Sequence, residues 1–264
     1  MSDGLPITVG VAGALGRMGA VVAAAVRQHE GMALTALFDR PGTEGQLLGE
    51  ATLVTADAAL ASCQVIIDFT VASASAGLAA RAAATQGAAL VIGSTGFTPE
   101  EDDQVREAAR TVAIVKSGNF SLGVNILAGL VEQAARRLPS IDWDIEVTEA
   151  HHRRKIDAPS GTALMLGAAA AEGREADLAQ VAVRGRDGIT GPRREGDIGF
   201  TAMRGGGIVG EHSVVFAADD EILTFSHSAR DRSLFAHGAM AATVWVAGRP
   251  PGLYDMKDVL GFRS

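Results

Sequence analysis

The side chains best suited to chemistry gather in one segment, EAHHRRKIDAPSGTA, at residues 149–163. His151 can give or take a proton near neutral pH, and Lys155 can supply a cation or a proton. Both functions suit the reduction of a polarised C=N bond. Residues 160–162 (SGT) precede an apolar stretch, so their amides and hydroxyls predict an anion seat for one carboxylate at a helix N-terminus. The alternative is a basic exposed loop followed by an ordinary helix cap.

A metal centre is not expected in this sequence. His151 and His152 are neighbours at the end of a predicted strand, so their side chains point to opposite sides and are poorly placed to chelate one ion together. No other group of Cys, His or acidic residues has ligand spacing. The segment RGGGIVGEH, residues 204–212, can form a backbone loop near an anionic substrate, although a flexible hairpin is the commoner explanation.

A second group of candidate residues is the glycine-rich stretch GVAGALGRMG at residues 10–19. Such a turn between a strand and a helix lets backbone amides approach a pyrophosphate. Val11 stands where the usual G-x-G-x-x-G pattern has its first glycine, and a merely structural turn is the alternative. Asp39 ends the next predicted strand, where a carboxylate can accept hydrogen bonds from an adenosine ribose, while Arg40 can instead pair with a 2′-phosphate. The order of these features favours dinucleotide binding.

Three further loops follow predicted strands, at residues 68–70 (DFT), 93–97 (GSTGF) and 117–120 (SGNF). Ligands of open α/β sheets bind outside the carboxyl ends of the strands, where all three loops are expected. Gly, Ser, Asn and Asp are also ordinary turn residues, so each loop alone is ambiguous. Together they suit a nicotinamide-ribose surface.

The elements that position these residues form two groups. Up to about residue 120, continuous apolar strands alternate with helices, which is typical of a doubly wound parallel sheet covered on both faces. Strands are predicted at residues 7–12, 34–38, 65–69, 88–92 and 112–115. Helices are predicted in the stretch to Val26 that has no breaker after Gly19, at 73–86 and from Thr98, where Pro99 and Glu101 complete a capping box.

After residue 120 the pattern changes to an α+β domain with a mixed, mostly antiparallel sheet. Residues 141–147 alternate apolar and polar side chains, as a strand with one wet face does. Short strands follow at 181–183, 198–203, 213–217 and 222–226, and residues 233–247 are helical again. We expect a dinucleotide-binding domain at 1–122, to which 232–264 return, and a substrate-binding and oligomerisation domain at 123–231.

Composition narrows the classes of function. With 264 residues, 47% of them hydrophobic and 20% charged, the chain is an ordinary globular protein. Its net charge of −8 gives no general attraction for nucleic acid or anionic membranes, so neither partner is expected. Cys63 is the sole cysteine, which excludes an intrachain disulfide and fits a reducing compartment. Without a basic signal-peptide start or a long apolar run, the chain is interpreted as cytoplasmic.

Taken together, the motifs resemble one family, the bacterial 4-hydroxy-tetrahydrodipicolinate reductases, also called dihydrodipicolinate reductases, of the diaminopimelate route to lysine. The resemblance covers nearly the whole chain in order, through GALGRMG, DFT, GSTGF, GNFSLGVN, EAHHRRKIDAPSGTA, RGGGIVGEH and YDMKDVLGF. It implies an enzyme that uses NADH or NADPH to reduce a cyclic dicarboxylate imine, formed when the hydroxylated precursor loses water. It also implies a homotetramer built through the sheet of the second domain.

The resemblance assigns residues to roles. His151 corresponds to the family's proton donor or acceptor and Lys155 to its proton donor. The implied cofactor contacts are Gly13, Ala14, Leu15, Gly16, Arg17, Met18, Asp39, Arg40, Gly93, Ser94, Thr95, Ser117, Gly118, Asn119 and Phe120. The implied substrate contacts are His152, Ser160, Gly161 and Thr162. Many relatives have Glu where this chain has Asp39, which leaves the choice between NADH and NADPH open.

Two other interpretations stay open from the residues alone. Another two-domain NAD(P)-dependent dehydrogenase would share the cofactor half and need a different second site. A non-catalytic dinucleotide sensor would keep the fold without turnover. The segment with His151, Lys155 and residues 160–162 argues against both.

Overall fold

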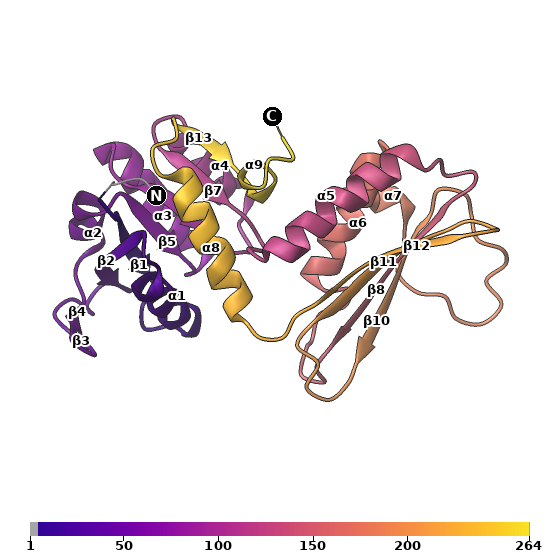
Figure 1. Cartoon of the computed structure of the whole chain (residues 1–264), viewed down its shortest axis with the longest axis horizontal. Helices are drawn as coiled ribbons and strands as arrows, with labels where there is room; N and C mark the ends of the chain where they lie inside the picture. Colours follow the sequence, from indigo (N-terminus) through magenta and orange to yellow (C-terminus); the bar gives the residue numbers. More distant parts are fainter. Residues whose placement is uncertain (1–4, 264) are drawn as a thin grey trace. The chain divides into compact units, whose positions relative to one another are not determined.

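The structure, a computed structural model, describes residues 5–263, and these divide into two compact units (Figure 1). Unit 1 combines the described residues of Met1–Leu122 with those of Ser233–Ser264, and unit 2 is the continuous stretch Gly123–Arg232. The end of the chain, yellow in Figure 1, thus belongs to the same unit as its indigo start.

Unit 1 is built on a six-stranded, entirely parallel sheet in the order β13-β7-β6-β5-β1-β2. Its central strands are continuous runs of buried Val and Ile, as parallel strands covered on both faces require. The strands are β1 (Ile7–Ala12), β2 (Met32–Phe38), β5 (Val65–Asp68), β6 (Ala89–Ile92), β7 (Ala113–Lys116) and β13 (Gly252–Tyr254). A separate two-stranded hairpin pairs β3 (Leu47–Leu48) with β4 (Ala51–Thr52).

Helices cover both faces of this sheet and make two hydrophobic cores. On one face α1 (Arg17–Gln28) packs beside α8 (Ser233–Val246), with Val9, Val65 and Val115 beneath them. The other face is covered by α2 (Ala56–Ser62), α3 (Ala72–Thr85) and α4 (Pro99–Ala108), over Ile66 and Ile114. A short helix, α9 (Met256–Val259), ends the unit. The doubly wound arrangement predicted from the sequence is confirmed.

Local sequence explains how two of these helices are fixed. The predicted capping box forms at α4, where Thr98 Oγ1 accepts from the Glu101 N–H at 3.2 Å and the Thr98 N–H donates to Glu101 Oε2 at 2.8 Å. Helix α8 approaches the loop after β7 so closely that a Cβ at Gly238 would collide with the Phe120 carbonyl. A glycine is required there.

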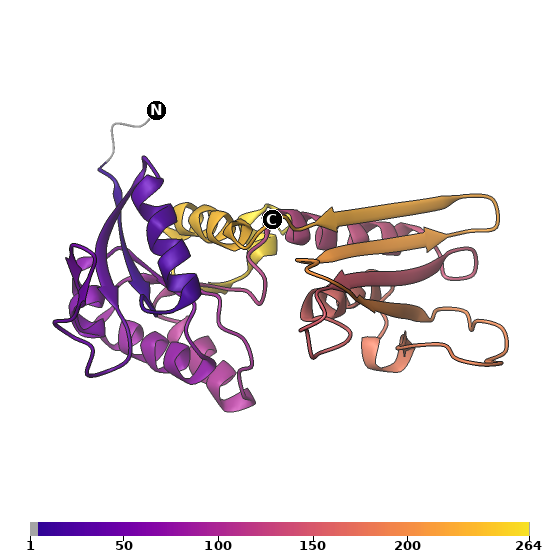
Figure 2. The same ribbon diagram turned by 90° about the horizontal axis from the view of Figure 1, so that it is seen from below.

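Unit 2 is a five-stranded sheet in the order β12-β11-β8-β10-β9 with helices on one face (Figure 2). Its strands are β8 (Asp144–His151), β9 (Ala182–Val183), β10 (Ile198–Arg204), β11 (Glu211–Ala217) and β12 (Ile222–Ser228). Its helices are α5 (Leu122–Arg137), α6 (Gly161–Gly173) and α7 (Leu178–Val181). The mixed sheet expected here is confirmed, and it contains two parallel pairings, β8 with β10 and β10 with β9, beside two antiparallel ones. Because α6 connects β8 to the strands that follow, β10 returns parallel to β8.

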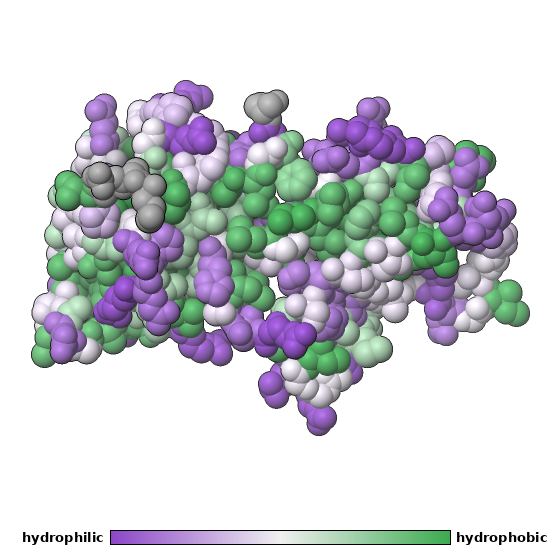
Figure 3. Space-filling model, viewed as in Figure 1, coloured by the Kyte–Doolittle hydropathy of each residue, from purple (hydrophilic) through white to green (hydrophobic). Residues whose placement is uncertain are grey.

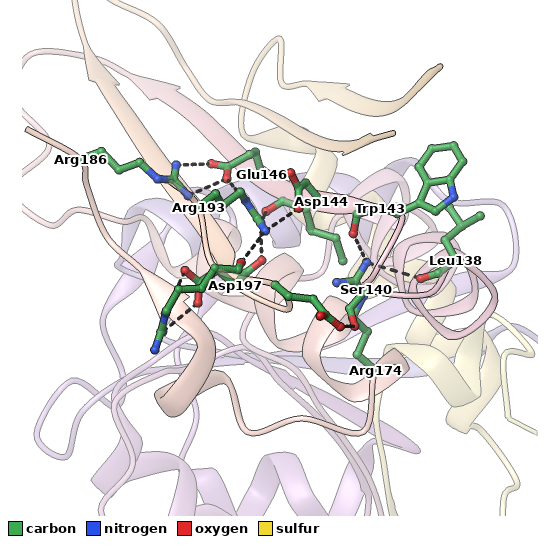
Figure 4. A network of polar contacts seen from close by, with 12 residues as sticks. Leu138, Ser140, Trp143, Asp144, Glu146, Arg174, Arg186, Arg193 and Asp197 are labelled. Atoms are coloured by element: carbon green, nitrogen blue, oxygen red, sulfur yellow. Dashed lines mark hydrogen bonds and ion pairs between the residues drawn. The ribbon is translucent and has the colours of Figure 1, made fainter. Parts of the chain in front are cut away.

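One predicted strand begins later than its pattern suggested. Residues 141–143 lie outside β8, which starts at Asp144, and Ile141 is exposed. The Trp143 N–H donates to the Pro139 carbonyl at 3.0 Å, which closes a turn after α5. Arg174 at the end of α6 donates to the carbonyls of Trp143 and Leu138 (Figure 4), and these hydrogen bonds stabilise the turn.

A cluster of ion pairs holds the long loop before β10 against the sheet of unit 2 (Figure 4). Arg186 bonds both carboxylate oxygens of Glu146, at 2.9 and 3.1 Å. Arg193 bonds Asp144 at 2.7 Å and Glu146 at 3.2 Å, and it donates to the backbone carbonyl of Asp197. Glu146 is therefore the carboxylate at which the two arginines of the loop meet.

The surface of unit 2 has an apolar side along α5, where Figure 3 shows hydrophobic residues in green. This helix buries Leu127 and Val131 in the core yet exposes Ile126 and Leu130. Within residues 5–263, no helix is long and apolar enough to cross a membrane.

Candidate active site

The glycine-rich turn of unit 1 links β1 to α1 and is shaped by close backbone contacts. Gly13 has a φ of +71°, in the left-handed region that glycine tolerates best. The Gly16 N–H donates to the Gly13 carbonyl at 2.9 Å, and a Cβ at Gly19 would collide with that same carbonyl. The turn is thus compact, and α1 begins from Gly16, an N-cap without a side chain. Backbone N–H groups at such a helix start favour an anion.

Asp39, at the end of β2, is tied to this turn by its carboxylate. Its Oδ2 accepts from the Leu15 N–H at 3.0 Å, and its Oδ1 accepts from the Arg40 N–H at 2.8 Å. A carboxylate has about four acceptor positions, so Asp39 keeps capacity for a ligand hydroxyl. Arg40 is exposed beside it.

These residues line a cleft of about 870 Å³ within unit 1. Of the predicted cofactor contacts, Gly13, Leu15, Gly16, Asp39 and Arg40 border it. The loop after β5, residues 68–70, also borders it, as do Pro41, Glu44 and Arg81. The structure therefore brings together at one cleft the glycine turn, Asp39 and one of the three strand-end loops that the sequence singles out.

The other predicted cofactor residues of unit 1 are not among those that border this cleft. Ala14 and Phe120 are almost completely buried, and Ser94 is buried with its hydroxyl 2.6 Å from that of Ser75. The remaining ones are Arg17, Met18, Gly93, Thr95, Ser117, Gly118 and Asn119. Gly93 lies against Phe69, whose ring a Cβ at that position would strike, so the loop after β6 is packed onto the loop after β5.

Asp68 at the end of β5 is fully buried at the edge of the cleft. Burial raises the pKa of its carboxyl. Hydrogen bonds from Ser75 and Thr70 favour the charged form and lower the pKa, but the effect of burial is larger. Thr70 donates to Oδ1 through its backbone N–H, at 2.8 Å, and through its hydroxyl, at 2.6 Å. These bonds shape the tight turn of residues 68–70.

In unit 2, His151 is the last residue of β8 and contacts a buried acid. Its Nδ1 lies 2.6 Å from Oε2 of Glu149, two residues earlier on the same face of the strand. Arg204, the last residue of β10, bonds both oxygens of Glu149 at 2.7 Å. The parallel register places Arg204 opposite His151, which brings these three side chains together.

Lys155 follows β8 in a tight turn, its N–H bonded to the His152 carbonyl at 3.1 Å. Its ammonium contacts both oxygens of Asp157 at 2.8 Å, and this partner holds the pKa of the exposed Asp157 carboxyl below its ordinary value. His152 has a buried Nδ1 without a hydrogen-bond partner among the described residues. Arg204 also donates to the Asp157 carbonyl, at 2.7 Å, so the turn is attached to β10.

The predicted anion seat lies at the start of α6. Ser160 is the N-cap and accepts from the Ala163 N–H at 3.1 Å. It is buried, and its own N–H donates to Glu149 Oε1 at 3.0 Å. Gly161, the first residue of the helix, is exposed, and a Cβ there would meet nothing within 4 Å. The seat therefore has Ser160 inside the fold and Gly161 at the surface.

His212 on β11 contacts both Ser160 and His151. Its Nε2 lies 3.0 Å from Ser160 Oγ, and its ring meets that of His151 edge to face with centroids 5.1 Å apart. Burial, reinforced by the nearby charge of His151, lowers the pKa of His212 to about 4. The imidazole of His212 is consequently neutral at neutral pH.

Three residues of this cluster were not assigned roles from the sequence. Glu149 and His212 lie within the motifs of residues 149–163 and 204–212, and for Arg204 the sequence predicts only that its loop can lie near an anionic substrate. The alternation of β8 places Glu149 and His151 on one face, which is a usable signal, whereas Arg204 is 55 residues away from Glu149 and is found only through the sheet register. In the part of the chain that the structure describes, no three His, Cys, Asp or Glu residues are grouped to hold a metal ion.

Comparison with known proteins gives a consistent result over the whole chain. The family model for the N-terminus of dihydrodipicolinate reductase matches residues 7–120, and that for its C-terminus matches residues 123–260. A 4-hydroxy-tetrahydrodipicolinate reductase from Caulobacter vibrioides is 61% identical over 259 residues, covering 98% of this chain and 99% of the relative. One from Rhizobium rhizogenes is 50% identical, covering 96% of each chain.

The fold is also that of a solved structure, a dipicolinate-bound dihydrodipicolinate reductase from a Paenisporosarcina species. The two share a TM-score of 0.78 at 21% identity, over 95% of this chain and 98% of the other. Since both family models and close relatives match the two units in order, this chain belongs to the dihydrodipicolinate reductase family.

Proposed function

We propose that the chain is the NAD(P)H-dependent 4-hydroxy-tetrahydrodipicolinate reductase of its organism, reducing the cyclic imine derived from 4-hydroxy-tetrahydrodipicolinate to tetrahydrodipicolinate in the diaminopimelate route to lysine. The observation that carries the proposal is the grouping of His151, Lys155 and the α6 N-terminus in unit 2. Arg204 bonds Glu149, the partner of His151, and also the carbonyl of Asp157, whose carboxylate holds Lys155, so the two proton-bearing groups share one neighbourhood. The relatives with this name match the chain along its length.

In this proposal the dinucleotide-binding domain comprises residues 1–122 and 232–264, which correspond to unit 1 except for Arg232, a residue of unit 2. The left-handed Gly13 and the side-chain-free N-cap Gly16 leave room for a pyrophosphate against the start of α1. Asp39 accepts from the adenosine ribose, and Arg40 pairs with the 2′-phosphate of NADPH. The loops at residues 93–95 and 117–120 line the nicotinamide side. The reduced cofactor, when bound, supplies the hydride.

Residues 123–231 form the substrate-binding and oligomerisation domain. Gly161 and Thr162 hold a substrate carboxylate at the α6 N-terminus, with Ser160 fixing the helix start and His152 beside it. When hydride reaches the conjugated C=N system of the cyclic imine, negative charge develops on that system. A proton and a nearby cation neutralise this charge. His151 Nε2 is the atom that exchanges a proton, and Lys155 Nζ supplies the cation or a proton.

The substrate is a small molecule, and we propose the remaining partners from the same observations. The face of the unit 2 sheet opposite α6 presents Thr148, Thr201, Ser213 and Val215, small side chains without a covering helix. This face suits the homotetramer expected from the family. We propose no nucleic acid or membrane partner, and a location in the cytoplasm.

The proposal is tested by steady-state assays with freshly generated substrate and either NADH or NADPH. Replacing His151 by Gln keeps a similar size but removes proton transfer, so kcat is expected to fall about 10²- to 10⁴-fold. Lys155→Ala is expected to lower kcat and raise the substrate KM. If the two residues act as one unit, the double variant loses much less than the product of the single losses.

Arg154→Ala, an exposed cation next to Lys155, is the matched control and should keep wild-type kcat. Deuterated cofactor shows whether hydride transfer limits the rate in each variant. Cofactor binding without turnover would instead identify a sensor, and turnover of a different amino-acid or sugar substrate would identify another dehydrogenase. Wild-type kcat in both single variants would remove His151 and Lys155 from the chemistry.

A further inference from the structure

Glu149 is the buried acid of the unit 2 cluster, with a side chain only 1% exposed, and each of its oxygens has two donors. Oε1 accepts from the Ser160 N–H at 3.0 Å and from Arg204 at 2.7 Å. Oε2 accepts from Arg204 at 2.7 Å and lies 2.6 Å from Nδ1 of His151. The four usable lone-pair directions of the carboxylate are therefore taken.

These contacts fix the proton on the imidazole of His151. Burial raises the pKa of the Glu149 carboxyl, but hydrogen bonds from Arg204, His151 and Ser160 outweigh burial and lower it overall. An ionised carboxylate can only accept, so Nδ1 of His151 must be the donor at 2.6 Å. In the neutral ring the lone pair is then on Nε2, the nitrogen that exchanges a proton with a ligand.

Arg204 is the group that keeps the acid in this orientation. Its guanidinium bonds both carboxylate oxygens, which fixes the plane of the carboxylate, and the same guanidinium bonds the Asp157 carbonyl at 2.7 Å. The other titratable groups near the His151 ring are His212 from β11 and the pair of Lys155 and Asp157 from the following turn. None of these bonds Nδ1 of His151 in the described structure.

We propose that Glu149, held by Arg204, is a positioning residue that keeps His151 protonated on Nδ1 and so presents Nε2 as the proton-exchanging atom. Glu149 does not touch the substrate in this arrangement and acts only through His151. The inference rests on the proposed function for its kinetic part, while the position of the proton can be measured without any turnover.

The direct test is the tautomer of His151, read from ¹⁵N chemical shifts of protein labelled with ¹⁵N-histidine. Spectra are recorded at pH 8.5, above the usual range of histidine titration, and His151→Gln identifies the signals. The full-length wild-type protein should show a protonated Nδ1 and an unprotonated Nε2 for His151. A wild-type spectrum with the proton on Nε2 overturns the proposal, whatever any variant does.

Glu149→Gln should switch this tautomer. A glutamine has one oxygen and one NH₂. The Oε1 position faces two fixed donors, Ser160 N–H and Arg204, whereas the Oε2 position faces one fixed donor, Arg204, and Nδ1 of His151, which can change its role, so the oxygen belongs near Ser160. The NH₂ then faces Nδ1 of His151, which can accept only by moving its proton to Nε2. The expected result is a protonated Nε2, with kcat about 10²- to 10⁴-fold lower and a substrate KM within about threefold of wild type.

Glu146→Gln is the matched control, because Glu146 lies on the same strand and also bonds two arginines (Figure 4). The alternation of side chains along β8 places it on the opposite face from Glu149. It should leave the His151 tautomer and kcat unchanged. Equal kinetic losses in the two Gln variants would show that loss of any carboxylate–arginine pair of β8 has the same effect, which overturns the positioning role.

Arg204→Lys keeps an ionised Glu149 and gives a second variant if Glu149→Gln does not fold. It should retain the Nδ1 proton and lose less kcat than Glu149→Gln, since Lys is a point charge that cannot bond both oxygens in one plane. A switched tautomer in Arg204→Lys contradicts the proposal. An inactive wild-type protein whose His151 carries the Nδ1 proton would refute the proposed function and leave the positioning role intact.

Discussion

Asp39 and Leu15 are joined by a hydrogen bond of 3.0 Å from the Leu15 N–H to Asp39 Oδ2, which ties the carboxyl end of β2 to the glycine turn. One carboxylate thereby shapes the turn and borders the cleft at the same time. The neighbouring Arg40 has its side chain exposed at the same cleft, so cofactor discrimination can be tested at Arg40 without disturbing the turn.

Arg40→Ala is expected to weaken NADPH binding more than NADH binding. The lost contact with a 2′-phosphate is charge-assisted and contributes about 1 to 3 kcal/mol, or roughly 5- to 150-fold in Kd. Calorimetric or fluorescence titration with both cofactors measures the difference. Arg27→Ala, an exposed arginine on α1 away from this cleft, is the control. Equal weakening of both cofactors would remove Arg40 from the 2′-phosphate role.

Gly161→Val tests the anion seat. Because a Cβ at this position meets nothing within 4 Å, the variant should fold normally, while its side chain obstructs a carboxylate at the start of α6. We expect a higher substrate KM with cofactor affinity unchanged. Gly77→Val, which has equal space but borders the cleft of unit 1, should show the reverse pattern. An unchanged substrate KM in folded Gly161→Val would place the carboxylate elsewhere.

Gly210→Ala probes the space beside the proton-exchanging nitrogen. A Cβ at Gly210 would lie 3.2 Å from His151 Nε2, and the ring cannot easily withdraw because Nδ1 is held 2.6 Å from Glu149. A shift of a few tenths of an ångström predicts a kcat lower by about tenfold. Gly207→Ala in the same loop, where a Cβ meets nothing within 4 Å, should behave as wild type. A fully active Gly210→Ala would show that the ring tolerates the displacement.

His212 predicts how the stability of unit 2 changes in mild acid. Its folded pKa of about 4 lies below its ordinary value of 6.5, so the unfolded chain binds the extra proton first as the pH falls. Stability should therefore decrease from pH 6.5 downwards, by roughly 2 kcal/mol between pH 7 and pH 5. The charged or titratable groups that act on it are His151, Glu149, His227 and Lys155.

Urea unfolding at pH 7 and pH 5, followed by circular dichroism, measures this effect. His212→Gln should reduce the loss of stability between the two pH values, even if it is less stable than wild type at pH 7. His237→Gln, at an exposed position on α8, should leave the pH dependence as it is. Glu149 does not contribute in this window, because its lowered pKa makes it lose its stabilising charge only below its ordinary value of 4.5.

The sequence predicts unit 1 well because its signals are local. Buried runs such as residues 65–67, the turn at Gly13 and the cap at Thr98 each depend on neighbours within a few residues. Unit 2 is less predictable. The exposed Ile141 fits an alternating strand pattern, yet the turn fixed by Arg174 excludes it from β8, and no local signal shows a bond that spans 31 residues to Trp143.

The same limit applies to the candidate site. His151 and Lys155 are recognisable by residue type, whereas the pairing of Glu149 with Arg204 depends on a parallel register between β8 and β10. Parallel neighbours need a long crossover, and a period-two pattern does not tell which strand returns beside which. A positioning group that comes from another strand is therefore found only in the folded chain.

The return of α8 and β13 to unit 1 has a consequence for synthesis on the ribosome. Unit 2 is one uninterrupted stretch, Gly123–Arg232, and all of its strands have been made before translation reaches Ser233. Unit 1, although it is begun first, lacks the helix that packs beside α1 and the edge strand beside β7 until the last thirty or so residues emerge. The usual order, in which the N-terminal domain of a nascent chain is completed first, is therefore reversed. During that interval the part of the sheet that α8 contacts, over β5, β6 and β7, is uncovered, which makes this stage of synthesis the one most exposed to aggregation.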